Sequence, residues 1–291
     1  MTIFRPASEA DLRSMYEVFY QNEIRDSPHP PPPGNTPSYL RHILQHGTLT
    51  VAELDGQVLA FAGAIQRGTI TFLTDLFVLP EHQSGHLGKT LLHSVFPQNG
   101  LVHCTVSSSD PRALALYIRL GMRPQWPLFA LSLEKSTRAM PVTPDVEIIQ
   151  ADPHDPEVVR WDTQISGLPR PVDHLYWVHE QQSIPLWFRR HQQIVGYGYV
   201  RRDAETVWHP NAWVLGPIGV NSAEDATPCV LAMVNWALQQ TDLLLIEVPG
   251  PHPCLAVLLE SGFRIIAFDT FVSTVPFFDG QCYIPSGGDL F

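Results

Sequence analysis

A glycine-bearing loop lies between an apolar strand and a helix in the first third of the chain. Residues 76–80 end the strand, and the loop carries Gly85 and Gly88, with the helix beginning near Leu87. Such a loop directs several backbone N–H groups toward one point, and the helix dipole adds about half a positive charge there. The pattern indicates a phosphate or pyrophosphate site, although an ordinary strand-to-helix turn has the same local signature. The loop contains neither Gly-x-Gly-x-x-Gly nor a Walker A sequence, which excludes the usual dinucleotide and P-loop sites.

A second motif, residues 110–122, has the termini of a short helix. Asp110 can cap its first turn, and Gly121 suits its C-terminal end. Tyr117 lies one position away from the apolar face of this helix, so its hydroxyl could act as a general acid. Taken alone, a tyrosine at this position is more often a packing residue, and the sequence leaves both roles open.

Together the two motifs resemble the GNAT superfamily of N-acetyltransferases. That family has a loop Gln/Arg-x-x-Gly-x-Gly/Ala after a strand that ends Val-x-Pro, and residues 83–88 read Gln-Ser-Gly-His-Leu-Gly after Val78-Leu79-Pro80. The family's later helix reads Asn-x-x-Ala-x-x-Leu-Tyr-x-x-x-Gly-Phe. The chain keeps four of its positions: Ala113, Leu116, Tyr117 and Gly121. The resemblance covers residues 2–134 in the order of elements, and residues 146–275 more weakly.

The resemblance implies transfer of an acetyl group from acetyl-CoA to the amine of a small molecule by direct attack. Tyr117 would donate a proton to the departing thiolate, and Asp75 is a candidate for the base that deprotonates the amine. Backbone groups of the strand end would pair with the pantetheine arm, and N–H groups of the loop would bind the pyrophosphate. The residues implied to hold CoA are Phe77, Val78, Gln83, Ser84, Gly85, His86, Leu87, Gly88, Lys89 and Thr90.

His86 is the main departure from the family's loop, because it stands where the family has its first glycine. If the backbone at this position needs a positive φ, a histidine costs roughly 1 kcal/mol or more. If it does not, the N–H of His86 serves as well as that of a glycine. Asp110 and Met122 also replace the family's usual asparagine and phenylalanine.

These motifs need a sheet with helices packed on it, and the chain predicts such an order of elements twice. Besides the two motif helices, the apolar spacing predicts helices near residues 9–20, 38–45, 156–163 and 224–239. Asp55-Gly56 and His191-Gln192 each lie between two apolar runs and predict hairpin turns. The dipeptide Phe77-Val78 at the end of a strand in the first copy corresponds in position to Gly219-Val220 in the second copy. We therefore predict an α/β protein of the α+β type, built from two tandem GNAT-like domains at residues 1–135 and 145–291. Each domain should be a mixed, largely antiparallel sheet flanked by helices. The polar, proline-bearing segment 134–145 would link them.

The second copy lacks the chemistry of the first. Its counterpart of the glycine loop, residues 225–230, has no glycine, adds Asp225, and contains Pro228, which has no N–H for a pyrophosphate. Leu258 stands where Tyr117 would be. We therefore predict that CoA binds in the first copy, and that the degenerate second copy completes a substrate cleft or stabilises the first.

Composition narrows the possible partners and location. The net charge is −11 and no run of basic residues occurs, which argues against nucleic-acid binding. No apolar run approaches the ~18 residues of a membrane span, and the start of the chain does not look like a signal peptide. The cysteines are widely spaced without a Cys-x-x-Cys pair, so we expect a cytoplasmic protein that binds no membrane and has no disulfide framework.

One pair of histidines has a spacing that can bind a metal. His42 and His46 lie four residues apart on a predicted helix. No third ligand accompanies them in the sequence, so we expect a solvated helix face and no metal cofactor.

Two other functions stay open at this stage. A peptide or protein N-acetyltransferase would use the same cofactor on a larger acceptor. A non-catalytic acyl-CoA-binding or sensor protein would fit the histidine in the loop and the degenerate second copy. Acidic side chains near the proline-rich segment 27–37 could attract a cationic amine, although a solvated face is the commoner role: Glu17, Glu23 and Asp26.

Overall fold

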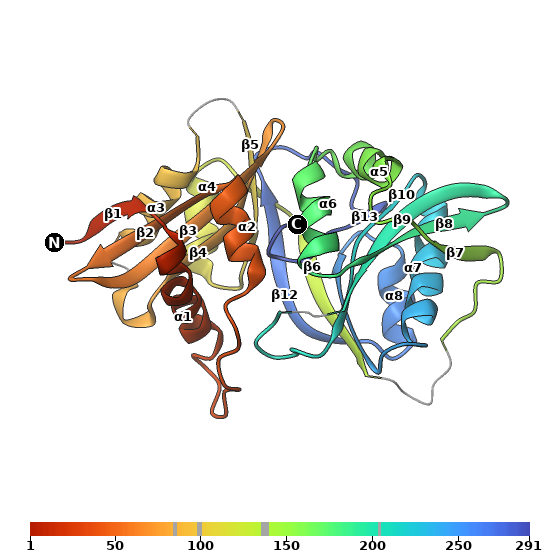
Figure 1. Ribbon diagram of the computed structural model, residues 1–291, viewed down its shortest axis with the longest axis horizontal. Coiled ribbons are helices and arrows are strands. Elements are labelled where there is room, and N and C mark those ends of the chain that lie inside the picture. The colour runs from red at the N-terminus through yellow and green to blue at the C-terminus, as the bar shows by residue number, and fades with distance from the viewer. Residues whose placement is uncertain (84–85, 98–100, 135–139, 203–204) are drawn as a thin grey trace. The chain divides into compact units, whose positions relative to one another are not determined.

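The computed structural model describes residues 1–83, 86–97, 101–134, 140–202 and 205–291 (Figure 1). The chain forms two compact units. Unit 1 comprises Met1–Thr105 and Glu205–Pro210, and unit 2 comprises Val106–Ala204 and Asn211–Phe291. These units differ from the two sequence copies, because residues 106–134 pack with unit 2 and residues 205–210 with unit 1. The boundaries of the copies themselves stay a prediction.

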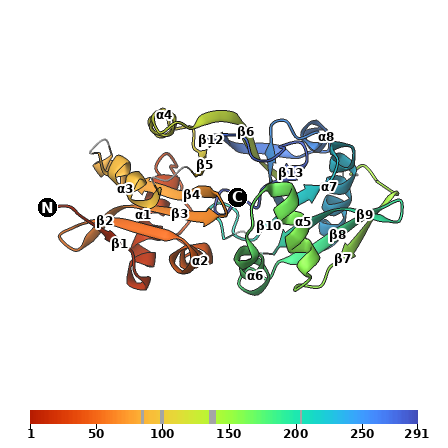
Figure 2. The ribbon, with the colours of Figure 1, turned by 90° about the horizontal axis from the view of Figure 1, so that it is seen from above.

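Unit 1 is a mixed sheet with helices on both faces (Figure 2). Its strands follow one another in the order β1 (Ile3–Pro6), β2 (Thr48–Leu54), β3 (Gln57–Arg67), β4 (Ile70–Val78) and β5 (Val102–Ser107), of which the last two residues belong to unit 2. The first four strands are antiparallel, and β4 pairs with β5 in parallel. Helices α1 (Leu12–Glu23) and α2 (Ser38–His46) cover one face, and α3 (Leu87–Val95) covers the other. Short 3-10 turns precede α1 at Glu9–Asp11 and follow β4 at Pro80–His82.

The local chemistry of unit 1 explains these elements. The turn between β2 and β3 places Asp55 at φ 50° and Gly56 at φ 85°, the conformation that a two-residue hairpin of the predicted kind requires. Helix α1 buries Leu12, Met15 and Tyr16 against the sheet, following the apolar spacing of its sequence. The predicted hairpin and helices of the first copy are therefore present.

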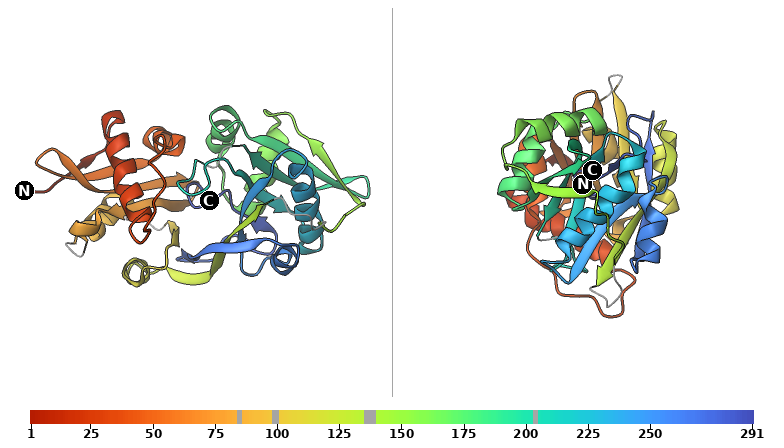
Figure 3. Two further views of the ribbon diagram at one scale, coloured as in Figure 1. Left: turned by 90° about the horizontal axis from the view of Figure 1, so that it is seen from below. Right: turned by 90° about the vertical axis from the view of Figure 1, so that its right-hand side faces the viewer.

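Unit 2 contains a second mixed sheet with helices on both faces (Figure 3). The strand order is β7 (Val146–Gln150), β8 (Ile184–Arg190), β9 (Gln193–Arg201), β10 (Trp213–Val220), β11 (Leu243–Pro249), β6 (Arg123–Glu134) and β12 (Arg264–Ser273), and β13 (Tyr283–Ile284) pairs with β10. The helices of this unit are α4 (Pro111–Arg119), α5 (Pro156–Ser166), α6 (Pro171–His179), α7 (Ala223–Ala237) and α8 (Cys254–Glu260). Helix α6 and strand β13 were not predicted from the sequence.

Strand β6 comes from the first sequence copy but completes the sheet of unit 2. It pairs antiparallel with β11 on one side and with β12 on the other, so that Leu131 lies opposite Ile246 and Ile265. Leu131 and Leu133 are buried in one apolar core with residues of α7 and α8, among them Val234. The end of the first copy is thus an internal part of the second sheet.

Strands β4 and β10 have the same place and the same irregularity in their sheets. The parallel pairing of β4 with β5 ends at Leu73, and that of β10 with β11 ends at Leu215, the residue that matches Leu73 in the sequence copies. Each strand then shifts register against its antiparallel neighbour, between Leu73 and Asp75 in β4 and between Leu215 and Ile218 in β10. The predicted fold class, two repeated and largely antiparallel sheets flanked by helices, is confirmed.

Among the residues that the structure describes, we find no helix with the length and apolar character needed to cross a bilayer.

Candidate active site

The end of β4 presents backbone groups on the side away from β3. The N–H of Leu79 donates to the carbonyl oxygen of Leu59 over 2.9 Å. The alternation of an antiparallel pair then directs the backbone groups of Phe77 toward β3, and those of Leu76 and Val78 toward the other side. We call the outward-facing backbone groups of Leu76 and Val78 the β4 edge. In the described part of the chain β5 has parted from β4 here, so the β4 edge can pair with an extended ligand.

The first turn of α3 lies beside the β4 edge. A Cβ placed on Gly88 would be 4.0 Å from Cγ2 of Val78, so the helix start and the strand end are neighbours. The N–H groups of Leu87, Gly88 and Lys89 belong to this first turn, where a helix offers no internal acceptor. The turn contains no acidic residue, and Lys89 is exposed. An anion is therefore favoured at this corner by the dipole, by the N–H groups and by one cationic side chain.

His86 precedes α3 in a left-handed conformation, with φ 67° and ψ 0°. The question left open by the sequence is thus answered, because this position does take the positive φ that favours glycine. A histidine there costs about 1–2 kcal/mol. Thr90 holds the conformation, since its N–H and its hydroxyl both donate to the carbonyl oxygen of His86, over 3.2 and 3.3 Å.

Gln83 ties the strand end to α1. Its Nε2 donates to Oδ1 of Asn22 over 3.0 Å and to the carbonyl oxygen of Val78 over 3.2 Å, while its Oε1 accepts from Arg25 over 3.1 Å. Nδ2 of Asn22 also donates to the carbonyl oxygen of Val78, over 3.1 Å. The sequence assigned a role to neither Asn22 nor Leu76. Asn22 lies on the polar face of an amphipathic helix, and the register of β4 was needed to find Leu76.

Two of the residues expected to hold CoA, Ser84 and Gly85, lie outside the described residues. The side chain of Phe77 packs against two other rings, with centroid distances of 5.1 Å to Phe19 and 5.7 Å to Phe61. The backbone groups of Phe77 face β3 and do not belong to the β4 edge. The roles of the other residues toward CoA stay predictions.

Asp75, the candidate base, is buried at the irregular point of β4, with 3% of its surface exposed. Oδ1 accepts from the hydroxyl of Tyr39 over 2.8 Å, and Oδ2 accepts from the hydroxyl of Thr74 over 2.7 Å. Gly63 makes room for this arrangement, because a Cβ there would come within 2.5 Å of Oγ1 of Thr74. The carboxylate is therefore held by two hydroxyl donors inside unit 1, and its role as a base stays a prediction.

Tyr117 lies on α4 in unit 2 and is 5% exposed. Its carbonyl oxygen accepts from the N–H groups of Leu120 and Met122, which close the end of the helix. Gly121 follows with φ 92°, as the predicted C-terminal glycine of this helix should. The helix and its termini are as predicted, and the catalytic role of the hydroxyl stays a prediction.

The counterpart of the glycine loop in the second copy is helical, and it lies within the helix predicted at residues 224–239. Residues 225–230 are not a loop but part of α7, which begins at Ala223, because the hydroxyl of Ser222 accepts from the N–H of Glu224 over 3.3 Å and caps the helix earlier. The first turn carries Glu224 and Asp225, and Asp225 forms an ion pair with Arg190 over 2.9 Å. Carboxylates thus stand at the start of α7, where the start of α3 has Lys89.

The histidine pair on α2 differs from its predicted setting. His42 is buried, with 5% of its surface exposed, and its ring packs 4.8 Å from that of His46. His46 is exposed, so only one of the two histidines lies on a solvated face. Within the described ranges no group of three or more His, Cys, Asp or Glu side chains could hold a metal ion.

Comparison with known proteins agrees with this geometry. Residues 10–122 match the family model described as the acetyltransferase (GNAT) family. Among solved structures, a putative acetyltransferase from Pyrococcus horikoshii is similar over 100% of this chain and 96% of its own, with 14% identity and a TM-score of 0.73. A tandem GNAT protein from the clavulanic acid biosynthesis pathway is similar over 95% and 99%, with 14% identity and a TM-score of 0.63. A GCN5-related N-acetyltransferase from Sphaerobacter thermophilus is similar over 96% and 97%, also with 14% identity and a TM-score of 0.63.

A comparison with curated protein sequences finds no significant match. The family match and the structural likeness nevertheless agree on one class. The chain carries a domain of the GNAT acetyltransferase family in residues 10–122, and its whole length has the fold of tandem GNAT proteins. The predicted family is therefore confirmed.

Proposed function

We propose that this protein transfers an acetyl group from acetyl-CoA to the amine of a small molecule. The observation that carries the proposal is the corner of unit 1, where the β4 edge and the first turn of α3 lie side by side. An extended chain with amide groups, such as a pantetheine arm, suits an unpaired strand edge. A diphosphate suits the helix start next to it. The pantetheine arm and the diphosphate of CoA would therefore bind to neighbouring groups, the β4 edge and the first turn of α3.

The proposed contacts follow the geometry of this corner. The N–H of Val78 and the backbone groups of Leu76 would pair with the pantetheine amides. N–H groups from His86 to Lys89 would bind the diphosphate, and the ammonium of Lys89 would add charge attraction. The residues present fit the cofactor, which supplies an activated thioester.

The reaction needs two proton movements that the protein has to support. The acceptor amine must be uncharged to attack the thioester carbonyl carbon, so a base takes one of its protons. The new C–N bond forms as the C–S bond breaks, and the thiolate takes up a proton, which we assign to the hydroxyl of Tyr117. Each of these transfers contributes about 10²–10⁴-fold to the rate.

Glu23 supports a cationic amine as the acceptor. It ends α1 directly after Asn22, whose side chain contacts the carbonyl oxygen of Val78. Desolvation of its carboxyl raises the pKa of Glu23, and a hydrogen bond with Trp208 opposes this rise. Trp208 is itself 42% exposed, so a carboxylate and an aromatic ring stand together at the surface of unit 1. This combination binds ammonium groups.

The test has two stages. CoA at about 100 times its Kd should stabilise the chain by roughly 2.7 kcal/mol, seen as a higher Tm. A panel of small amines should then release free thiol from acetyl-CoA, with cationic amines ahead of neutral ones. An unchanged melting curve at millimolar CoA would remove the cofactor from the proposal.

A non-catalytic acyl-CoA sensor is the second candidate, and the strained His86 favours it. In that case CoA would raise the Tm, but neither amines nor peptides would release thiol. Thiol release with peptides alone would instead indicate a peptide N-acetyltransferase.

A further inference from the structure

Strand β10 has an outward edge that corresponds to the β4 edge. The N–H of Asn221 donates to the carbonyl oxygen of Val195 over 3.0 Å, as that of Leu79 does to Leu59 at the end of β4. The alternation of the pair therefore directs the backbone groups of Val220 and Ile218 away from β9. We call these groups the β10 edge. They match Val78 and Leu76 in the sequence copies and in the register of the sheet.

The β10 edge is occupied by a late segment of the chain itself. The N–H of Val220 donates to the carbonyl oxygen of Cys282 over 3.0 Å. Strand β13 continues this contact, with Ile284 opposite Ile218 and Tyr283 opposite Gly219. An extended peptide thus pairs with the backbone positions that match Leu76 and Val78 of the β4 edge.

We propose that Cys282–Ile284 fill, in unit 2, the place that a pantetheine arm takes in unit 1. The β10 edge is then a binding groove with a built-in peptide occupant. The comparison of this peptide with a pantetheine arm rests on the proposed function. The pairing of Cys282–Ile284 with the β10 edge does not depend on it. The chain itself occupies the groove of unit 2 and so excludes CoA from it. The carboxylates at the start of α7 also disfavour the diphosphate.

The fit between groove and occupant is close. Gly216 lies at the register shift of β10 with φ 145°, and a Cβ there would collide with the carbonyl oxygen of Pro285. Tyr283 and Ile284 are both fully buried. Ile284 belongs to the apolar core of unit 2, together with Leu215. The groove is therefore shaped for a peptide backbone at close range.

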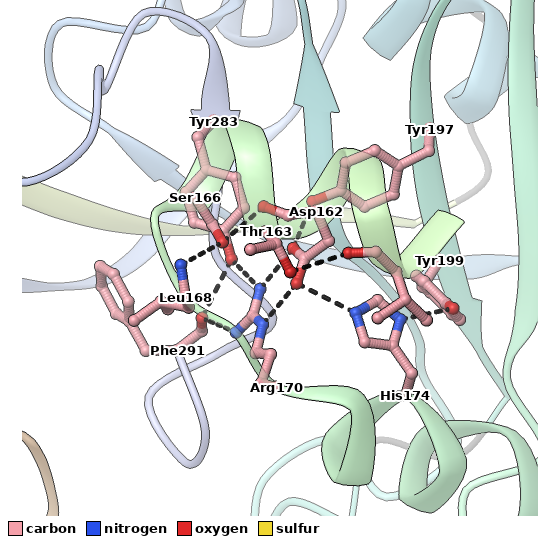
Figure 4. A network of polar contacts seen from close by, with 11 residues as sticks. Asp162, Thr163, Ser166, Leu168, Arg170, His174, Tyr197, Tyr199, Tyr283 and Phe291 are labelled. Carbon is pink, nitrogen blue, oxygen red and sulfur yellow. Dashed lines mark hydrogen bonds and ion pairs between the residues drawn. The ribbon is translucent and has the colours of Figure 1, made fainter. Parts of the chain in front are cut away.

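Two buried arginines hold β13 and the residues that follow it. Arg170 donates to the hydroxyl of Tyr283 and to the backbone oxygen of Phe291, over 2.5 Å each (Figure 4). Arg201 donates to the carbonyl oxygen of Ser286 and forms an ion pair with Asp289 over 3.3 Å. Both guanidinium groups are almost completely buried, with 0% and 4% of the residue exposed.

Asp162 fixes Arg170 in turn. Its oxygens accept from Nε and Nη2 of Arg170 over 2.7 and 2.8 Å, and from the hydroxyl of Tyr197 over 2.5 Å (Figure 4). His174 contacts the same carboxylate through Nε2 at 3.0 Å. Burial opposes the charge of Asp162, but Arg170 holds the pKa of this carboxyl below its usual range. Withdrawal of residues 283–291 would leave buried arginines short of partners, which is strongly unfavourable.

Hydrogen exchange of the intact chain with and without CoA tests the inference. We expect the amides of Val220 and of residues 282–284 to exchange at least 10-fold more slowly than those of Leu76 and Val78 without ligand. Saturating CoA should slow exchange at 76–78 and 86–90 and leave 218–220 and 282–284 unchanged. Fast exchange at 282–284, or protection of 218–220 by CoA, would overturn it. If CoA protects nothing while 282–284 stay protected, the proposed function fails and the occupied groove stands.

A variant opens the groove. Gly216→Ala places a methyl group against Pro285 and should raise exchange at 282–284 at least 10-fold. Gly121→Ala is the matched control, because Gly121 also has a positive φ but has open space around its Cβ position. Pantetheine, which lacks the diphosphate, should then protect 218–220 in Gly216→Ala and not in the unmodified protein. Unchanged exchange at 282–284, or no protection by pantetheine once these residues are released, would overturn the assignment of the groove.

Discussion

The first turns of α3 and α7 follow equivalent strands but carry opposite charge. Lys89 stands in the first turn of α3, and Glu224 and Asp225 stand in that of α7. Both strands before them part from a parallel neighbour at matching residues and then shift register. The frame of the site is thus kept in both units, while the groups that would attract an anion are present in one.

The strand edges, like the helix starts, favour an external ligand in unit 1 and not in unit 2. The β4 edge can take an external chain, whereas the β10 edge is paired with Cys282–Ile284. One frame therefore supports two uses, an open corner suited to a cofactor and a closed corner that stabilises the fold. Substitutions that alter one corner and leave the other intact separate these two uses.

The largest effect is expected at Tyr117, for which the second sequence copy has Leu258. Tyr117→Phe removes only the hydroxyl oxygen, so kcat should fall about 10- to 1000-fold while the Tm changes little. Steady-state thiol release at saturating acetyl-CoA measures the rate, and a melting curve measures the stability. A large loss of stability would instead assign Tyr117 to core packing, in line with the fully buried Leu258.

The next effect concerns CoA binding at Gly88. Gly88→Trp covers the start of α3 beside Val78, so the stabilisation by CoA, roughly 2.7 kcal/mol at 100 times Kd, should disappear. Glu224→Trp, at the exposed start of α7, is the control and should leave the CoA shift intact. Calorimetric titration of the unmodified protein should give one CoA per chain. Two equivalent sites per chain would show that the two corners do not differ in function.

Reversal of the charge at Lys89 should have a moderate effect. Lys89→Glu gives α3 the kind of first turn that α7 has, and should weaken CoA binding about 10-fold at low salt, since each charge at a helix start is worth about 0.3–1 kcal/mol. The loss should shrink as salt screens the charges. Asp225→Lys should create no second CoA site, because β10 remains occupied. Equal CoA affinity for Lys89→Glu and the unmodified protein would contradict the assignment of the diphosphate to this turn.

The strain at His86 predicts a smaller gain in stability. His86→Gly should raise the unfolding free energy by about 1 kcal/mol, because φ 67° suits glycine. His93→Gly, within α3, should lower it by roughly 0.5 kcal/mol. Denaturant unfolding of both variants provides the comparison. A destabilised His86→Gly protein would show that the histidine side chain contributes more than its backbone costs.

The smallest effect is a change in pH dependence at Glu247, which β11 carries where β5 has Val106. Burial, with added repulsion from Asp269 and Asp289, raises the pKa of Glu247 to about 7. The unfolded chain ionises this group at a lower pH, so its contribution to stability falls as the pH rises from about 4.5 to about 7. Glu247→Gln should therefore be more stable than the unmodified protein at pH 8, by roughly 1 kcal/mol, and equal at pH 4. Unfolding curves across this pH range check the sign.

Local signals in the sequence predicted most of the elements. The helices at Ser38–His46, Leu87–Val95 and Pro111–Arg119 begin where their sequences indicated, and the turn at His191-Gln192 takes the positive φ values of a tight hairpin. Capping, apolar spacing and turn chemistry act over a few residues, so they can be recognised without the rest of the chain. The helix predicted at residues 224–239 begins one residue earlier, at Ala223, where Ser222 caps it.

Features that depend on distant contacts could not be predicted. The pairing of β6 with β11 and β12 joins strands that lie far apart in the sequence, and residues 283–284 form a strand only because the β10 edge is there to pair with. No pattern in the sequence marks Arg170, which is buried with its partners Asp162 and Phe291. The family motif located the site, but Asn22 and Leu76 emerged only from the register and packing of β4.

The position of β6 has a consequence for synthesis of the protein. Leu131 leaves the ribosome more than one hundred residues before its partners Ile246 and Ile265. At typical translation rates this delay is on the order of ten seconds, during which the apolar strand β6 has no neighbouring strands to pair with. A chain cut after residue 135 would never receive those neighbours and should aggregate or be degraded. Folding of the end of the first copy therefore depends on synthesis of the second copy.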